Sequence, residues 1–170
     1  MTAGRMAAAL RPYLPADAPA LAEIFRASIE ELAADDYSTA QQEAWASAAD
    51  DDEEFGKRLA GALTLVATME GEPVGFASLK GGDAVDMLYV HPEAAGQGVA
   101  TMLYGALEKL AQGRGATRLT TDASDTALPF FERRGFQAQR RNTVVRAGEW
   151  LANTTMEKRL AANEAGSAPP

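Results

Sequence analysis

The chain of 170 residues is long enough for one domain with a buried core and short for two. Apolar residues make up 46% and charged residues 24%, a globular balance that excludes fibrous, collagen-like and disordered classes. Cysteine is absent and histidine occurs once, as His91, which excludes disulfides and thiolate metal sites and disfavours a zinc site. We therefore expect no bound metal.

The net charge of -8 is unevenly distributed along the chain. The first 55 residues hold 12 of the 24 acidic side chains but only three basic ones. Such a segment repels nucleic acid and suits a cationic partner, although acidic side chains that solvate helix surfaces explain the composition more simply. The apolar stretches are too short for an export signal or a membrane span. We expect a cytoplasmic protein without nucleic-acid or membrane partners.

The first third of the chain is predicted to be helical after one short strand over residues 8–11. Asp17 is the expected cap of a helix whose core-facing residues recur at helical spacing, namely Leu21, Ile24, Phe25, Ser28 and Leu32. A turn over residues 35–38 separates it from a second helix, which Ser38 caps and which carries Trp45. The acidic turn over residues 50–54 precedes a short third helix.

Three strands follow, over residues 63–68, 73–79 and 85–90, and the glycine turns between them predict an antiparallel meander. A helix then begins at Gly98, with its apolar face formed by Ala100, Leu103, Leu107, Leu110 and Ala111. The remaining predicted elements are a strand over 118–121, a helix over 127–134 and strands over 136–145 and 152–160. These elements form one domain over residues 7–160, and residues 1–6 and 161–170 are expected to be flexible tails.

The segment 86–104 reads DMLYVHPEAAGQGVATMLY and is the most informative part of the sequence. A strand runs into a glycine turn that opens a helix, and the unpaired N–H groups there suit a phosphate or pyrophosphate. Gly96 and Gly98 let an anion approach the backbone without a Cβ. The dinucleotide pattern GxGxxG fails because Thr101 takes the third glycine position, and no Gly-Lys-Ser/Thr follows for a P-loop. A simple turn and helix cap would explain the glycine pair equally well.

The order of elements, with LYVHPEAAGQGVA and the later ALPFFERRGF, resembles the GNAT superfamily of acyl-CoA-dependent N-acyltransferases over nearly the whole chain. The resemblance implies an α/β (α+β) fold, with a central mixed, mostly antiparallel twisted sheet flanked by helices. It implies acetyl-CoA as the acyl donor. The cofactor-binding residues that it implies are Leu88, Tyr89, Val90, Gly96, Gln97, Gly98, Val99, Ala100, Thr101, Ser124 and Phe131.

In this family the backbone amides of the turn at residues 96–101 bind the CoA pyrophosphate. Gln97 stands where arginine is frequent. Ala95 departs from the usual glutamine or arginine, so one side-chain contact is lost while backbone binding is expected to survive. The backbone of residues 87–90 would pair with the pantetheine amides and orient the thioester. Core packing of the strand's side chains is compatible with that role.

Two further positions matter near the thioester. Ser124 would contact the pantetheine arm or cap the next helix, and the two roles are equally supported. Phe131 stands where many relatives have a tyrosine that protonates the leaving thiolate, and a phenyl ring has no proton to give. The sequence therefore leaves the identity of the general acid undetermined, and water or another donor such as Tyr104 are the alternatives.

Direct attack by an amine requires a neutral nitrogen, so a carboxylate that accepts its proton is valuable. Asp86 is the candidate base, because it lies in an otherwise apolar segment that would strengthen it as a proton acceptor. A solvent-facing aspartate on a half-exposed strand is the alternative. Asp36, Tyr37 and Trp45 form an acidic and aromatic set that would hold a cationic acceptor. Core packing explains Trp45 more simply, and a loop explains the other two equally well.

We predict an N-acetyltransferase that moves an acetyl group from acetyl-CoA to a primary amine of a cationic small molecule or peptide, by direct attack in a ternary complex. A non-catalytic acyl-CoA-binding or regulatory module on the same fold is the alternative, motivated by Ala95 and Phe131. The acceptor, the acyl length and the oligomeric state, including a possible homodimer, are left open by the sequence.

Overall fold

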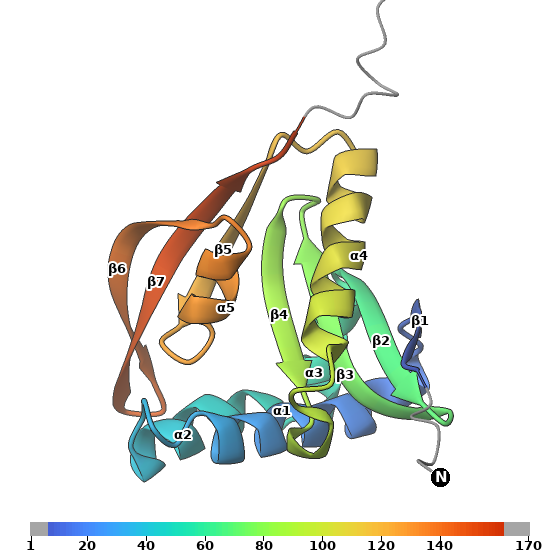
Figure 1. The fold of residues 1–170 in the computed structure, drawn as a ribbon. Helices are drawn as coiled ribbons and strands as arrows, with labels where there is room; N and C mark the ends of the chain where they lie inside the picture. The colour runs from blue at the N-terminus through green and yellow to red at the C-terminus, as the bar shows by residue number, and fades with distance from the viewer. Residues whose placement is uncertain (1–6, 162–170) are drawn as a thin grey trace, which may run out of the picture.

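The computed structural model describes residues 7–161, so the predicted tails lie outside the described residues apart from Ala161. One seven-stranded sheet forms the centre, in the order β1-β2-β3-β4-β5-β7-β6 (Figure 1). In chain order the elements are β1 (Ala9–Pro12), η1 (Pro15–Asp17), α1 (Ala18–Leu32), α2 (Thr39–Ala46), η2 (Ser47–Ala49), α3 (Asp52–Ala60), β2 (Leu63–Met69), β3 (Glu72–Lys80), β4 (Ala84–Val90), η3 (Pro92–Ala94), α4 (Val99–Gly113), β5 (Arg118–Ser124), α5 (Leu128–Arg133), β6 (Gln137–Arg146) and β7 (Glu149–Arg159).

The sheet is mixed and mostly antiparallel, as predicted. Strands β1 to β4 form an antiparallel meander, and β5, β7 and β6 pair antiparallel on the other side. The two groups are joined by the parallel pair β4 and β5, which contains only the residue pairs Ala84 with Thr120 and Val85 with Thr121. Beyond these pairs the strands diverge (Figure 1). The sheet is therefore split along part of its length.

Helices cover both faces of the sheet because each face carries apolar side chains. Leu103 and Leu107 of α4 are fully buried against one face. On the other face, Phe25 of α1 and Phe55 of α3 pack with Phe76 of β3, and the rings of Phe25 and Phe55 lie 5.4 Å apart. Burying such rings stabilises the fold by about 1.5–3 kcal/mol each. No helix within residues 7–161 is both long and apolar enough to cross a membrane.

The helix starts confirm one predicted cap and correct another. Ser38 accepts a hydrogen bond from the Gln41 amide at 3.1 Å and caps α2, as predicted. Asp17 makes no side-chain cap for α1, because its carboxylate bonds the Leu14 amide at 2.8 Å and forms two bonds to Arg11. Leu32 was expected on the buried face and is 40% exposed, because α1 ends there and the chain turns away.

The Arg11–Asp17 ion pair should make the free energy of unfolding depend on pH. The hydrogen bonds from Arg11 hold the pKa of Asp17 below its usual value, although partial burial opposes this. A lowered carboxyl pKa contributes stability above the unfolded value of about 4, which is lost as pH falls through the folded value. Asp17→Asn should cost about 1–2 kcal/mol at neutral pH, and this cost should shrink as pH falls from about 4 to about 2. Urea unfolding at neutral pH and at about pH 2 measures this difference.

The exposed Asp35 provides a matched control, since no hydrogen bond or ion pair of its side chain is found within the described residues. Asp35→Asn should leave the urea midpoint nearly unchanged at both pH values. An equal loss of stability at neutral and acid pH in Asp17→Asn would contradict the ion-pair explanation.

The last two strands form a hairpin with a two-residue turn. Ala147 and Gly148 connect β6 to β7, and their φ angles are +46° and +80°. Positive φ at both positions suits the right-handed twist of a hairpin. The sequence placed the start of the last strand at residue 152 instead of Glu149, because alanine rarely adopts positive φ and the turn was not recognised.

Candidate active site

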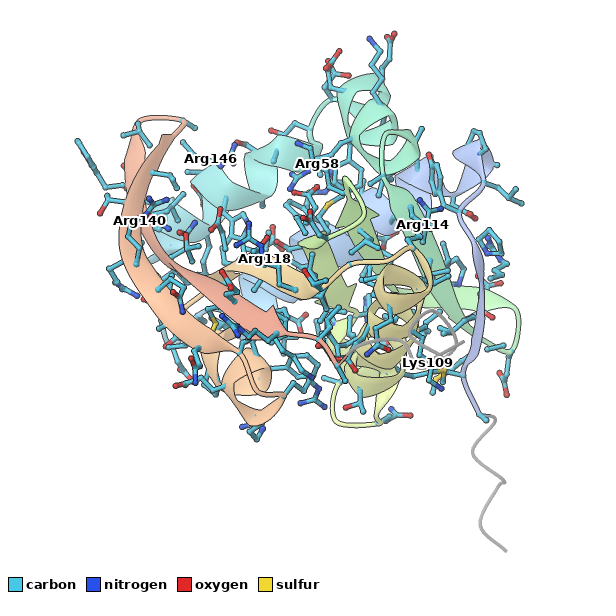
Figure 2. All side chains as sticks on the ribbon, turned by 90° about the horizontal axis from the view of Figure 1, so that it is seen from above. Arg58, Lys109, Arg114, Arg118, Arg140 and Arg146 are labelled. Atoms are coloured by element: carbon cyan, nitrogen blue, oxygen red, sulfur yellow. The ribbon has the colours of Figure 1, made fainter. Side chains whose placement is uncertain are left out.

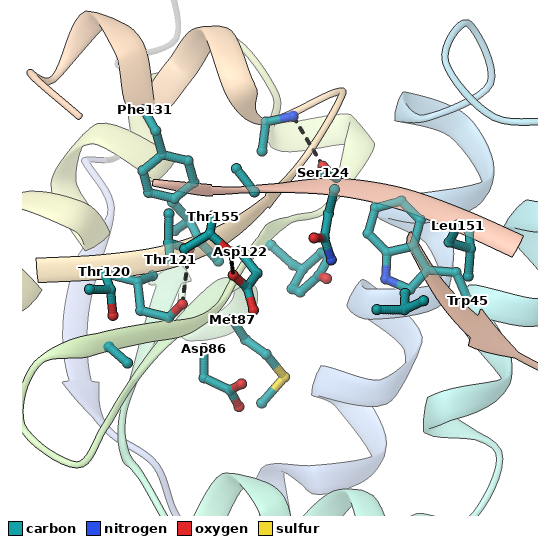
Figure 3. Close-up of a pocket in the computed structure, with 18 of the residues that line it drawn as sticks. Trp45, Asp86, Met87, Thr120, Thr121, Asp122, Ser124, Phe131, Leu151 and Thr155 are labelled. Carbon is teal, nitrogen blue, oxygen red and sulfur yellow. Dashed lines mark hydrogen bonds between the residues drawn. The ribbon is translucent and has the colours of Figure 1, made fainter. Parts of the chain in front are cut away.

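The split in the sheet contains a cavity of about 580 Å³ (Figure 3). Its walls come from β4 and β5, from Trp45 of α2 and Arg58 of α3, and from the β6–β7 hairpin. The predicted site residues that line it are Tyr37, Trp45, Asp86, Leu88, Tyr89, Ser124 and Phe131. The predicted residues outside its lining are Asp36, Val90, Gly96, Gln97, Gly98, Val99, Ala100 and Thr101. The structure thus brings the donor strand and the aromatic residues together.

The glycine turn lies beyond the end of β4 and opens α4. Gly96 and Gly98 have φ angles of +77° and +82°, and a Cβ at either position would meet nothing within 4 Å. Gly98 is the N-cap residue of α4, and no side chain of the described residues makes a capping hydrogen bond at this helix start. The first N–H groups of α4 are therefore available to an anion in the open space beside the turn.

The other turn residues contribute mainly through the backbone. The Gln97 side chain donates to the Glu93 carbonyl at 3.1 Å, so it folds back on the turn. Val99 is 2% exposed and packs in the core, which leaves only its backbone for a ligand. Thr101 accepts a hydrogen bond from Arg134 at 2.5 Å, and this guanidinium stacks 3.7 Å above the Phe130 ring. Arg134 therefore places a positive charge near the helix start.

The side chains of β4 alternate between the two faces of the sheet. Leu88 and Val90 pack against the α4 core, whereas Tyr89 packs with the core of α1 and α3. Within the described residues, the β4 edge beyond Val85 has no strand partner on the β5 side. This leaves backbone groups of β4 open to the cavity, where pairing with pantetheine was predicted.

Tyr89 forms the floor of the cavity on the side of α1 and α2. Its ring lies 4.7 Å from Phe25, 5.7 Å from Phe76 and 6.3 Å from Trp45. Burial raises the pKa of Tyr89 to about 12, although the indole of Trp45 and the guanidinium of Arg58 oppose the rise. The phenol is therefore protonated at neutral pH and can donate a hydrogen bond.

Asp86 faces the cavity but is paired with Arg58, a residue that sequence reasoning missed. Arg58 Nε lies 2.9 Å from Asp86 Oδ2, and Arg58 Nη2 lies 3.2 Å from Oδ1. Burial would lower the pKa of Arg58, but Asp86 outweighs it and raises the pKa. The expected apolar surroundings of Asp86 are wrong, because α3 brings a guanidinium to it from 28 residues away. This geometry argues against a free carboxylate base at Asp86.

The predicted acceptor set is divided by the fold. The Asp36 carboxylate accepts a hydrogen bond from Thr126 and lies outside the cavity lining, because the turn after α1 directs it there. Tyr37 and Trp45 line the cavity with ring centroids 5.3 Å apart. The Tyr37 hydroxyl donates to the Ala152 carbonyl at 2.7 Å and accepts from the Asp125 amide at 2.9 Å. Tyr37 therefore also ties together three walls of the cavity.

The residues near the predicted thioester position have defined partners. Ser124 lines the cavity, and its hydroxyl accepts from the Ala127 amide at 3.1 Å ahead of α5. Phe131 is 3% exposed and forms an apolar wall. The alternative proton donor Tyr104 lies outside the cavity lining and donates to Glu108 at 2.8 Å. The geometry therefore does not support Tyr104 as the donor.

Several cavity residues were not identified from the sequence. Asp122, Asn153 and Thr155 line the cavity, and so do the basic residues Lys80 and Arg146. The sequence predicts a fifth strand that ends at residue 121, whereas β5 continues to Ser124 and includes Asp122. The polar run 120–122 after a buried leucine was the available signal. Within residues 7–161, no group of three or more potential metal ligands is found.

Residues 33–160 match the family described as an acetyltransferase (GNAT) domain. The chain belongs to the GNAT acetyltransferase family. This GNAT protein is therefore classed as an acyltransferase that uses acetyl-CoA, as predicted from the two motifs.

Individual relatives agree with the assignment. This GNAT chain is 38% identical over 147 residues to a protein of Escherichia coli K12 named uncharacterized N-acetyltransferase YafP, covering 86% of this chain and 93% of YafP. A crystal structure from Rhodopseudomonas palustris, described as a GCN5-related N-acetyltransferase and class-II aminotransferase, is 65% identical with a TM-score of 0.89, covering 91% of this chain and 98% of that one.

A more distant relative shares the overall fold. The PaiA N-acetyltransferase of Thermoplasma acidophilum, solved in complex with coenzyme A, is 20% identical to this GNAT chain with a TM-score of 0.75. The match covers 91% of this chain and 100% of that chain. This likeness shows the shared fold.

Proposed function

We propose that this protein transfers the acetyl group of acetyl-CoA to a primary amine held in the cavity between β4 and β5. The observation that carries the proposal is the short pairing of β4 with β5, which opens the cavity along the strand that leads to the uncapped start of α4. The acceptor is a small molecule or peptide whose amine is a cation in solution. Both substrates are bound together when the amine attacks.

The proposed donor path follows the open edge of β4. Backbone amides of residues 96–101 bind the pyrophosphate, because the start of α4 offers N–H groups at the positive end of its dipole. The backbone of residues 88–90 pairs with the pantetheine amides, and a β4 N–H stabilises the oxyanion of the attacked thioester. Ser124 and Phe131 then flank the arm from β5 and α5.

The proposed acceptor path lies on the side of α2 and α3. Trp45 and Tyr37 offer ring faces that attract a cation. The protonated Tyr89 phenol belongs to the donor strand β4, and its ring packs against Trp45 on this side. The ion pair of Asp86 with Arg58 contributes a wall with little net charge. The remaining charged groups of the cavity are therefore left to recognise the acceptor.

The function is tested by following coenzyme A thiol release from acetyl-CoA with a panel of primary amines. The expected result is amine-dependent thiol release with an equal amount of acetylated amine, identified by mass spectrometry. The alternative of a non-catalytic module predicts CoA binding in calorimetry and no amine-dependent release. That outcome would exclude the transferase function.

Phe131→Tyr should speed the chemical step when departure of the thiolate limits it. The substitution places a phenol at a cavity wall where only an apolar ring exists. General-acid help reaches about 10²-fold when aligned, and we expect a smaller gain from an unoptimised hydroxyl. Single-turnover acetyl transfer to one amine measures it.

Phe130→Tyr is the matched control, because Phe130 neighbours Phe131 on α5 but does not line the cavity. It should leave the single-turnover rate constant unchanged. A rate constant for Phe131→Tyr at or below that of the parent would show that Phe131 is a wall and not the site of a missing acid.

A further inference from the structure

The two carboxylates of the cavity have different partners. Asp86 is held by two nitrogens of the Arg58 guanidinium, Nε and Nη2. Asp122, on β5, accepts a hydrogen bond from the Thr155 hydroxyl at 2.6 Å through Oδ1, and no cation pairs with it within the described residues. Figure 3 shows both aspartates projecting into the same part of the cavity. Asp122 is thus the carboxylate there with a free oxygen, Oδ2.

A chain of hydrogen bonds across three strands fixes the position of Asp122. Asn142 of β6 donates from Nδ2 to Thr155 Oγ1 at 2.7 Å and to Asn153 Oδ1 at 3.0 Å. The Asn142 amide nitrogen can only donate and a carboxylate oxygen can only accept, so the Thr155 hydroxyl hydrogen points to Asp122. The carboxylate therefore receives this donor on one oxygen and presents the other to the cavity.

A positive group without a partner lines the same cavity. Arg146 ends β6, and its side chain forms no hydrogen bond or ion pair within the described residues. Figure 2 shows Arg146 and Arg58 on the same side of the molecule. The pair of Arg58 with Asp86 is internally neutral, which leaves one carboxylate, at Asp122, and one guanidinium, at Arg146. The Lys80 side chain adds positive charge where β3 ends.

From this arrangement we infer that the acceptor is a zwitterion, a primary amine that also carries a carboxylate. Asp122 binds the ammonium group, and Arg146 binds the carboxylate through its planar fork of N–H donors. The inference rests on the proposed function and names the class of its acceptor. A cavity with a positioned carboxylate, at Asp122, and basic groups that have no partner in the described part of the chain, at Arg146 and Lys80, is complementary to a molecule that carries both charges.

The transfer then balances in atoms and charge. The bound ammonium loses one proton through Asp122 to solvent and becomes the attacking amine. The new N–C bond forms as the C–S bond breaks, and the second proton from nitrogen neutralises the departing thiolate. The products are the N-acetylated amino acid and coenzyme A. Asp122 returns to its ionised form after each turnover.

The test compares acceptors that differ only in the carboxylate, namely ω-amino carboxylates and alkylamines of the same chain length, together with amino acids and their carboxamides. With the parent protein, kcat/KM should be at least about tenfold higher for the carboxylate member of each pair. Arg146→Gln should abolish this preference by raising KM of the carboxylate members with little change in kcat. Arg146→Lys should restore part of it, because a point charge remains.

Asp122→Asn should behave differently from Arg146→Gln. It should lower kcat/KM about tenfold or more for every amine, with or without a carboxylate, because the ammonium contact is shared. Arg114→Gln is the control, because it removes one positive charge from an exposed position beyond α4, far from Arg146 in Figure 2. It should leave both the rate and the preference unchanged.

Equal acetylation of both members of each pair, unchanged by Arg146→Gln, would overturn the zwitterion inference and leave the transferase function intact. An alkylamine preference that Arg146→Gln does not alter would also overturn it. Failure to acetylate any amine, despite CoA binding in calorimetry, would overturn the proposed function itself. Circular dichroism of each variant confirms that the folded state is being compared.

Discussion

Replacing Gly98 with glutamate is expected to lower the affinity for coenzyme A by at least about 100-fold. The new carboxylate would occupy the open space beside the first N–H groups of α4 and repel the pyrophosphate. The φ angle of +82° also strains any residue with a Cβ at this position. Isothermal titration of the folded variant with coenzyme A measures the loss.

Gly115→Glu separates the anion effect from backbone strain. Gly115 has a φ angle of +86° and lies past the opposite end of the same helix. Its substitution should cost similar stability and leave coenzyme A affinity unchanged. Parent-like coenzyme A affinity in a folded Gly98→Glu variant would remove the turn from the cofactor site.

Tyr37→Phe is expected to destabilise the fold by about 2–4 kcal/mol, because removing one hydroxyl leaves two backbone groups without a partner. The hydroxyl bonds the Ala152 carbonyl and the Asp125 amide, and Tyr37 is 6% exposed. Burial raises the pKa of Tyr37. Its contribution is therefore present below the unfolded value of about 10 and lost as pH rises through the folded value.

Urea unfolding of parent and variant at neutral pH and above about pH 10 measures both effects. Tyr13→Phe is the control, since no hydrogen bond of the Tyr13 hydroxyl is found in the part of the chain that the structure describes. It should change the free energy of unfolding by much less. A Tyr37→Phe variant as stable as the parent would mean that the two backbone groups find other partners.

Much of the fold could be predicted because local patterns and glycine turns agree with the tertiary structure. The meander, the helix after Gly98 and the Ser38 cap each follow from a few neighbouring residues. The cap at Asp17 was wrong because Arg11, brought close by the start of the chain, competes for the same carboxylate. This competition arises only once β1 brings Arg11 close to Asp17, so the spacing of apolar residues along the helix cannot reveal it.

The site was predictable where one short segment forms it and less so where several elements meet. Residues 86–90 and 96–101 are contiguous, so their roles could be assigned from a motif. The pairing of Asp86 with Arg58 joins β4 to α3, and Arg146 reaches the cavity from β6. Charges that meet only through the fold have no fixed sequence spacing. For this reason the apolar surroundings expected for Asp86 were wrong.

The two-residue joint between β4 and β5 makes the molecule mechanically a pair of half-sheets. Long antiparallel ladders of backbone hydrogen bonds hold each half together, whereas few backbone hydrogen bonds join β4 to β5. We therefore expect the two half-sheets to move relative to each other, about residues 84–85 and 120–121, more easily than the strands move within either half. A coenzyme bound between β4 and β5 would contact both half-sheets. Binding of acetyl-CoA is therefore expected to stabilise the folded protein and to make the two halves unfold as one cooperative unit.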